Sequence, residues 1–268
     1  MTILFIKAHG ACNDFLLTWA YEVPEIADRP TLARAICDRN TGVGADGWLV
    51  LSDTPDADLG IELWNSDGSP SELSGNGTRC AAAVAVDRGF ASDQVRISTG
   101  AGVKTLRLLH RDGLRFVFEM NMGRPSLEEL RARLALSSGE QDATILNVGN
   151  PQCAIFVDDF DFDWRAMGAE IERHSRFPHR TNVSFIRSVD AHTIDVRFFE
   201  RGAGETASSG TGSTGAAAAA VARQLASSPV RVLTPAGPLE LRWQQDEVLL
   251  AGPAEIVARG EYFADAEN

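Results

Sequence analysis

The sequence predicts an α/β (α+β) protein of two similar halves, each with strands wrapped around one central helix. Ser74-Gly75-Asn76-Gly77-Thr78 precedes a run of alanines, and Ser209-Gly210-Thr211-Gly212-Ser213 precedes another, about half of the 268-residue chain away. Short apolar and alternating segments, typical of strands, surround both copies in the same order. Hydrophobic residues at 44% and charged residues at 23% indicate a globular protein of one large domain or two ordinary ones.

The first half is expected to begin with two strands around a turn at residues 10–14, followed by a helix with Pro30 near its start. A glycine-rich loop over 38–47 and a polar turn over 65–70 interrupt the next strands. The first repeat then leads into the central helix, which should end near Arg88-Gly89 with glycine as its C-cap. The expected elements are a helix over Pro30–Cys37 and strands over Thr2–Ile6, Phe15–Trp19, Trp48–Leu51, Ile61–Trp64, Val95–Ser98, Val103–Leu109 and Leu114–Met120.

The second half repeats this order after a junction near residues 121–125. Its second repeat should begin a helix that continues to about Leu225. The other expected elements are a helix over Asp163–Glu172 and strands over Thr144–Val148, Cys153–Val157, Val183–Arg187, Thr193–Phe199, Val230–Leu233, Leu239–Trp243 and Glu247–Ala251.

The charge and cysteine content narrow the class of partner and compartment. A formal net charge of −12 and a pI of about 4.9 argue against a nucleic-acid or anionic-membrane surface. No stretch has the length and apolarity of a membrane span, and the N-terminus lacks the pattern of a signal peptide. The four scattered cysteines show no metal-ligand spacing, so we expect no metal site and a reducing cytoplasm.

The repeated Ser-Gly turns predict a binding site for a small anion. A turn of small residues leaves the first backbone N–H groups of the following helix available to a ligand. Two such helix ends that face each other would hold one anion with a hydroxyl on each side. Neither copy has the Gly-Lys-Ser/Thr of a phosphate loop, and Gly210–Gly215 lacks the parallel strand pattern and acidic residue of a dinucleotide site.

Polar side chains at the ends of strands extend this prediction. Glu200-Arg201 lies between a strand and the second repeat in a Gly-Ala-Gly loop, and arginine is well suited to bind a carboxylate. Alone, this pair also fits a surface ion pair. Four asparagines follow strands or lie in turns, where each alone fits a turn residue: Asn13, Asn65, Asn150 and Asn182.

Together these segments resemble the diaminopimelate epimerase family of cofactor-independent amino-acid epimerases. The matching motifs run nearly end to end. They are Lys7–Gly10 with Asn13–Phe15, Asp38–Gly47, Asn65–Ser69, Gly75–Cys80, Asn147–Pro151, Thr181–Val183, Glu200–Thr206 and Gly210–Gly212.

The resemblance implies two pseudo-symmetric domains, each a rolled, mostly antiparallel sheet around a central helix, with the active site between them. The N-terminal half would span 1–118, completed by 256–268, and the C-terminal half would span 119–255. The implied reaction interconverts LL- and meso-diaminopimelate, a precursor of lysine and peptidoglycan, without a cofactor. A small amino acid would be the ligand, and a homodimer is possible.

The resemblance also assigns roles to individual residues. One cysteine on each face of the substrate Cα exchanges the proton in the family, and Ser74 and Ser209 occupy those positions here. Backbone N–H groups at Gly75-Asn76 and Gly210-Thr211 would hold the reacting carboxylate. The residues implied to contact the substrate are Asn13, Asn65, Asn150, Asn182, Glu200 and Arg201.

Four positions depart from the family pattern. Besides the two serines, Gln152 stands where a histidine is frequent and Gly47 where the family has glutamine. Because the changes go together, they favour a natural divergent member over a deliberate double substitution. A serine hydroxyl is a much weaker acid than a thiol. The sequence therefore leaves three functions open: an epimerase, a silent protein that binds an amino acid or related carboxylate, and another isomerase or lyase on the same scaffold.

Overall fold

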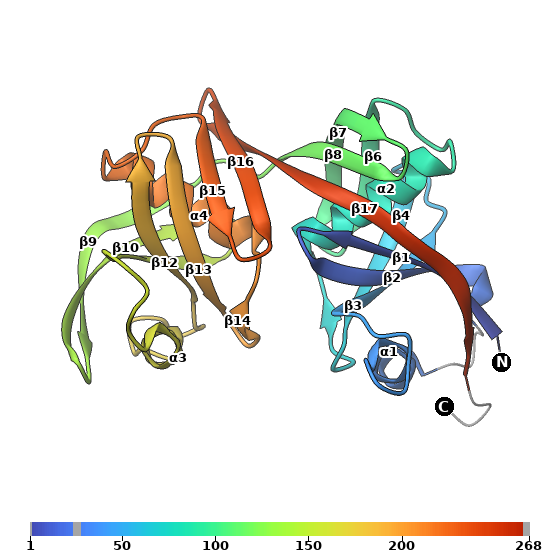
Figure 1. Cartoon of the computed structure of the whole chain (residues 1–268), viewed down its shortest axis with the longest axis horizontal. Coiled ribbons are helices and arrows are strands. Elements are labelled where there is room, and N and C mark those ends of the chain that lie inside the picture. The colour runs from blue at the N-terminus through green and yellow to red at the C-terminus, as the bar shows by residue number, and fades with distance from the viewer. Residues whose placement is uncertain (1, 24–27, 265–268) are drawn as a thin grey trace. The chain divides into compact units, whose positions relative to one another are not determined.

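A computed structural model of the chain describes residues 2–23 and 28–264 and divides into two compact units. Unit 1 contains the chain up to Met120 and again from Gly252 onward, and unit 2 contains Asn121–Ala251. The sequence analysis places the corresponding boundaries after residues 118 and 255. Figure 1 shows the chain passing between the units twice, once after β8 and once within the long strand β17.

Unit 1 is a ring of strands around the central helix α2 (Figure 1). Strand β17 pairs with both β1 and β8, and these two pairings close the ring of strands. Two of its strand pairs, β2 with β3 and β4 with β6, are parallel. The elements are β1 (Thr2–Gly10), β2 (Asn13–Trp19), η1 (Ala20–Glu22), α1 (Arg29–Cys37), β3 (Gly47–Ser52), β4 (Leu59–Asn65), β5 (Pro70–Ser71), α2 (Gly75–Asp87), β6 (Gln94–Thr99), β7 (Gly102–Asp112), β8 (Arg115–Asn121) and the C-terminal part of β17 (Glu247–Phe263).

Unit 2 has the same order of pairings around the helix α4. Its parallel pairs are β11 with β12 and β13 with β15. In the sequence, a helix lies between the two strands of each pair, as in the parallel pairs of unit 1. Strand β9 pairs with β10 as β17 pairs with β1 in unit 1. The elements are β9 (Ser126–Leu136), β10 (Gly139–Asn147), β11 (Pro151–Phe156), α3 (Trp164–Glu172), β12 (Asn182–Asp190), β13 (Thr193–Glu200), β14 (Gly204–Thr206), α4 (Gly210–Ala222), β15 (Val230–Thr234), β16 (Gly237–Gln244) and the N-terminal part of β17.

The predicted fold class is confirmed, and several elements differ from expectation. Helix α4 ends at Ala222, three residues early, because Arg223 caps it and Gln224 adopts a positive φ of 61°. Helix α2 ends near Arg88-Gly89 as predicted, but Arg88 is the cap residue and Gly89 follows it with a φ of 77°. Strand β9 was not predicted, because its charged residues outnumber the apolar ones that it buries, Ala132, Leu134 and Leu136.

Small side chains allow the strands to surround each central helix closely. Ala81–Ala85 of α2 are fully buried, as are Ala216 and Ala217 of α4. Gly215 has the same role, because a Cβ there would lie 3.0 Å from Cγ of Gln152. None of the described helices has the length and the apolar character that a bilayer crossing requires.

This close packing predicts opposite outcomes for two neighbouring alanines. Ala217→Leu should destabilise the protein by about 1–3 kcal/mol, because the added atoms have no space in a filled core. Ala218→Leu is the matched control, since Ala218 lies on the same helix but is only partly buried. Thermal unfolding of the two variants measures the difference, and an equal midpoint for both would contradict close packing around α4.

Candidate functional site

The first repeat forms the N-terminus of α2 and is capped by Ser74. The Ser74 Oγ accepts the N–H of Gly77 at 3.1 Å, and its carbonyl accepts the N–H of Thr78 at 2.8 Å. Ser74 has an extended backbone, with φ −129° and ψ 120°, as an N-cap requires. The N–H groups of Gly75 and Asn76 have no partner among the described residues, and they form the predicted cradle of unit 1.

The second repeat forms the same structure at the N-terminus of α4. The Ser209 Oγ accepts the N–H of Gly212 at 3.0 Å, and its carbonyl accepts the N–H of Ser213 at 2.9 Å. Its backbone, with φ −140° and ψ 124°, nearly matches that of Ser74. Within the described part of unit 2, the N–H groups of Gly210 and Thr211 likewise have no partner. Each unit therefore carries one helix N-terminus suited to an anion.

A carboxylate lies beside the serine of unit 2. Ser209 Oγ donates a hydrogen bond to Glu200 Oε2 at 2.8 Å, and Thr206 Oγ1 donates to the other oxygen at 2.7 Å. Burial raises the pKa of Glu200, and these two hydrogen bonds oppose the rise. Sequence reasoning gave Glu200 a substrate contact only, whereas the structure supplies Ser209 with the neighbouring base that a serine needs.

The serine of unit 1 has a different environment. Asn65, at the end of β4, occupies the place that Glu200 occupies at the end of β13. Its Nδ2 donates to Ser69 Oγ at 3.0 Å, so it supports the polar turn after β4. Among the residues that the structure describes, none accepts a hydrogen bond from the Ser74 hydroxyl. We call each helix N-terminus, with its serine and the side chains around it, a half-site. The two half-sites therefore have similar backbones but differ in charge.

The other predicted residues gather around the same two helix ends. In unit 1, Asn76 Nδ2 donates to Asn13 Oδ1 at 3.1 Å. In unit 2, Asn150 Nδ2 donates to Thr211 Oγ1 at 3.3 Å and accepts at Oδ1 from Gln152 at 2.7 Å. In each unit, a side chain of a cradle residue is thus hydrogen-bonded to an asparagine from a neighbouring strand or turn.

Asn182 and Arg201 meet beside the cradle of unit 2. The Arg201 N–H donates to Asn182 Oδ1 at 3.0 Å, and Asn182 Nδ2 donates to the carbonyl of Pro151 at 3.2 Å. The exposed Arg201 guanidinium donates to the carbonyl of His179 at 3.3 Å. Asn65 differs from the other predicted asparagines, because its side chain bonds only to Ser69 of its own turn among the described residues.

Sequence reasoning missed two residues at these sites, Arg79 and Asp46. Arg79 is fully buried in the first turns of α2, and Asp46 accepts a hydrogen bond from Asn13 at 2.7 Å. An arginine inside a helix of otherwise small residues is a signal that sequence analysis could have used. The buried Cys153 lies in β11, where burial raises the pKa of its thiol to about 12, so it behaves as a core residue.

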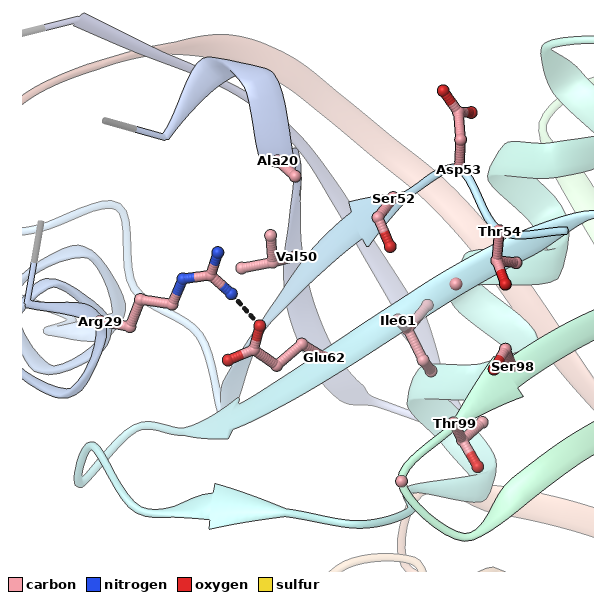
Figure 2. Close-up of a pocket in the computed structure, with 12 residues that line it drawn as sticks. Ala20, Arg29, Val50, Ser52, Asp53, Thr54, Ile61, Glu62, Ser98 and Thr99 are labelled. Carbon is pink, nitrogen blue, oxygen red and sulfur yellow. Dashed lines mark hydrogen bonds and ion pairs between the residues drawn. The ribbon is translucent and has the colours of Figure 1, made fainter. Parts of the chain in front are cut away.

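A pocket elsewhere in unit 1 lies apart from these residues (Figure 2). It has a volume of about 430 Å³ and is lined by hydroxyls from β3, β6 and their loops, together with the ion pair between Arg29 and Glu62. No predicted site residue lines it. In the described chain, no cluster of three or more His, Cys, Asp or Glu residues could hold a metal ion.

Comparison with known proteins decides the family. The family model described as diaminopimelate epimerase matches residues 5–128 and 144–257. The chain belongs to the diaminopimelate epimerase family. The unmatched residues 129–143 include the turn of the β9–β10 hairpin, the part of the fold that sequence analysis also missed.

Two relatives agree with this family. The chain is 39% identical to the diaminopimelate epimerase of Pelotomaculum thermopropionicum over 274 residues, 96% of this chain and 98% of the relative. It is also 39% identical to that of Aromatoleum aromaticum over 282 residues, 99% of this chain and all of the relative.

A hydroxyproline epimerase of Agrobacterium vitis, solved with trans-4-hydroxy-L-proline, has a TM-score of 0.73 at 15% identity. That match covers 99% of this chain and 94% of the solved one, and it shows the shared fold. The expected enzyme class, an isomerase of the epimerase type, is confirmed at the level of the diaminopimelate epimerase family.

Proposed function

We propose that this chain is an amino-acid epimerase that interconverts LL- and meso-diaminopimelate without a cofactor. Membership of the family and the two capped helix N-termini support this function. The observation that carries it is the hydrogen bond of 2.8 Å from Ser209 Oγ to Glu200, because it joins a hydroxyl at an anion cradle to a base. A homodimer and a cytoplasmic location stay predictions.

The resemblance to the family implies that both half-sites act on one substrate molecule, and the proposed reaction follows this implication. The backbone N–H groups at the starts of α2 and α4 hold the substrate carboxylate and stabilise the negative charge that develops when Cα loses its proton. Ser209 Oγ takes the Cα proton while it passes its own proton to Glu200. The Ser74 hydroxyl then returns a proton to the opposite face, solvent restores the proton of Ser74, and Glu200 releases its extra proton to solvent.

The raised pKa of Glu200 suits this role. A carboxylate with a higher pKa is a stronger base, and efficient proton transfer needs a base whose pKa is close to the working pH. Thr206 and Ser209 hold the two oxygens in place, so the carboxylate is oriented before substrate binds.

One assay tests the proposal directly. Purified protein in D₂O with LL-diaminopimelate should replace the Cα proton by deuterium and form the meso isomer, both followed by NMR. Binding of diaminopimelate without exchange would contradict the epimerase function.

A second candidate function is a binding protein that has lost turnover. It is favoured by one observation, that the hydroxyl of Ser74 has no acceptor among the described residues of unit 1. Calorimetric binding of diaminopimelate in the same preparation separates the two functions, because the silent protein would bind and leave Cα–H intact.

A further inference from the structure

Arg79 is a buried cation in the first turns of α2. It is 0% exposed, its Nε donates to the carbonyl of Pro253 at 3.1 Å, and its Nη2 donates to Asn76 Oδ1. Its Nη1 has no partner within the described chain and lies 3.9 Å from where a Cβ of Gly75 would be. Burial lowers the pKa of Arg79 to about 10, so it is still charged at neutral pH.

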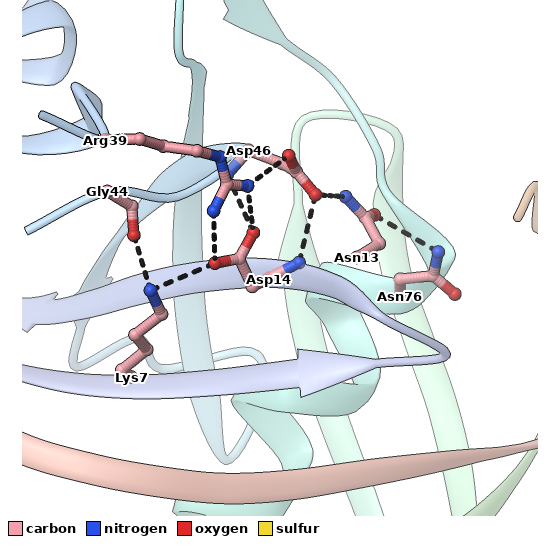
Figure 3. Close-up of polar contacts among 7 residues, drawn as sticks. All are labelled: Lys7, Asn13, Asp14, Arg39, Gly44, Asp46 and Asn76. Atoms are coloured by element: carbon pink, nitrogen blue, oxygen red, sulfur yellow. Dashed lines mark hydrogen bonds and ion pairs between the residues drawn. The ribbon is translucent and has the colours of Figure 1, made fainter. Parts of the chain in front are cut away.

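From Arg79 a series of hydrogen bonds runs to Asp46, and Figure 3 shows its outer part. Asn76 Nδ2 donates to Asn13 Oδ1 at 3.1 Å, and Asn13 Nδ2 donates to Asp46 Oδ2 at 2.7 Å. We call these four residues, Arg79, Asn76, Asn13 and Asp46, the amide relay.

The two ends of the amide relay fix its direction. A guanidinium can only donate hydrogen bonds, and a carboxylate can only accept them. The two asparagines between them can therefore satisfy both ends in one arrangement only, with each oxygen toward Arg79 and each nitrogen toward Asp46. Each nitrogen then keeps one further N–H for another acceptor.

A cluster of charges holds the Asp46 end in place (Figure 3). Arg39 Nη2 donates to Asp46 Oδ1 at 2.8 Å and to Asp14 Oδ1 at 2.7 Å, and Lys7 Nζ lies 3.1 Å from Asp14 Oδ2. Burial raises the pKa of Asp14, but hydrogen bonds from Arg39 and Lys7 outweigh it and hold this pKa below its usual value. Asp14 therefore stays ionised and keeps Arg39 against Asp46.

We propose that Arg79 is a positioning residue that makes the unit 1 half-site selective for an anionic acceptor. Through the relay it presents the remaining N–H groups of Asn13 and Asn76 to the ligand, beside the backbone N–H groups of Gly75 and Asn76. The half-site then binds a carboxylate and rejects a carboxamide, whose NH₂ would meet donors only. Identifying this acceptor with the carboxylate of diaminopimelate rests on the proposed function.

Among the residues that the structure describes, the corresponding site in unit 2 has no such relay. Thr214 occupies the place of Arg79 in α4, and its Oγ1 donates back to the carbonyl of Gly210 at 2.9 Å. Asn150 is bonded to Thr211 and Gln152, which are neutral. The selectivity for an anion is therefore a property of unit 1.

The test uses acetate and acetamide, which do not require the protein to be an epimerase. In ¹⁵N-labelled full-length protein, acetate should shift the backbone amides of Gly75 and Asn76, and acetamide should shift them at least about tenfold more weakly. Arg79→Gln and Asp46→Asn should each remove this discrimination, the second because asparagine lets the relay reverse. Arg79→Lys keeps the charge and a donor, so it should retain most of the discrimination between acetate and acetamide.

Arg223→Lys is the matched control. The side chain of Arg223 is only 6% exposed and also has one nitrogen lacking a partner in the described chain, but Arg223 caps the C-terminus of α4. It should leave the discrimination at Gly75 unchanged. If Arg79→Gln does not fold, the exposed Asp46→Asn carries the test alone.

A wild-type ratio of acetate to acetamide binding in Arg79→Gln or Asp46→Asn would overturn the inference. Absence of diaminopimelate exchange in the unaltered protein would instead overturn the proposed function, and the acetate result would stand.

Discussion

Glu200→Gln is expected to slow Cα–H exchange of LL-diaminopimelate by about 10²–10⁴-fold, the usual contribution of a general base. Glutamine has the shape of glutamate and can accept the hydrogen bonds of Ser209 and Thr206 only at its single oxygen. It cannot take the proton that Ser209 passes on. Substrate affinity should change much less than the exchange rate, because the cradle N–H groups are untouched.

The pH profile identifies the cause of this loss. The carboxylate form of Glu200 is the active base, so exchange should fall as the pH drops through the pKa of Glu200. Burial raises that pKa, which places the fall at a higher pH than for an ordinary glutamate. Glu200→Gln should lack this limb of the profile.

Glu205→Gln is the control for this variant. Glu205 lies in the adjacent strand β14, is exposed and pairs with Arg165 at 2.5 Å, so its removal should leave both rate and profile unchanged. An exchange rate in Glu200→Gln equal to that of the control would refute Glu200 as the base.

Ser74→Cys together with Ser209→Cys is expected to raise the exchange rate, by about 10²-fold or more. The family resemblance predicts thiols at both places, and a thiol at a helix N-terminus ionises far more readily than a hydroxyl. The two single changes should differ. Ser74→Cys should have the larger effect, because Ser74 lacks a base among the described residues whereas Ser209 already has Glu200. The measurement is again Cα deuteration.

The opposite result would have a specific meaning. If the double variant binds diaminopimelate and gains no exchange, Gln152 and Gly47 indicate a pocket that has changed beyond its acid and base. The structure shows how tightly both are placed. Gln152 is 2% exposed against Gly215, and a Cβ on Gly47 would lie 3.0 Å from the carbonyl of Trp64.

The sequence predicted most elements because their signals are local. Ser74 and Ser209 mark the helix starts, and the alanine runs mark the central helices. It missed β9 because that strand buries one narrow face and exposes Glu128, Arg131 and Arg133. A strand of this kind is stabilised by its partner β10, which local patterns do not reveal.

The sequence predicted which residues belong to the candidate site, but it did not predict the hydrogen bonds between them. Residues before the helices and after the strands are visible as motifs. The pairing of Glu200 with Ser209 depends on how β13 and the loop before α4 fold against each other, nine positions apart in the sequence. The contact between Asn13 and Asn76 joins residues 63 positions apart. No spacing rule predicts such contacts.

The division of β17 between the two units has a consequence for synthesis of the chain. Unit 2 is continuous from Asn121 to Ala251, so its last strand leaves the ribosome before the partner strand of β1 does. The N-terminal part of unit 1 therefore stays incomplete until the C-terminal part of β17 has emerged. Until residues 255–263 emerge, β1 exposes an open edge, the type of surface on which nascent chains associate wrongly.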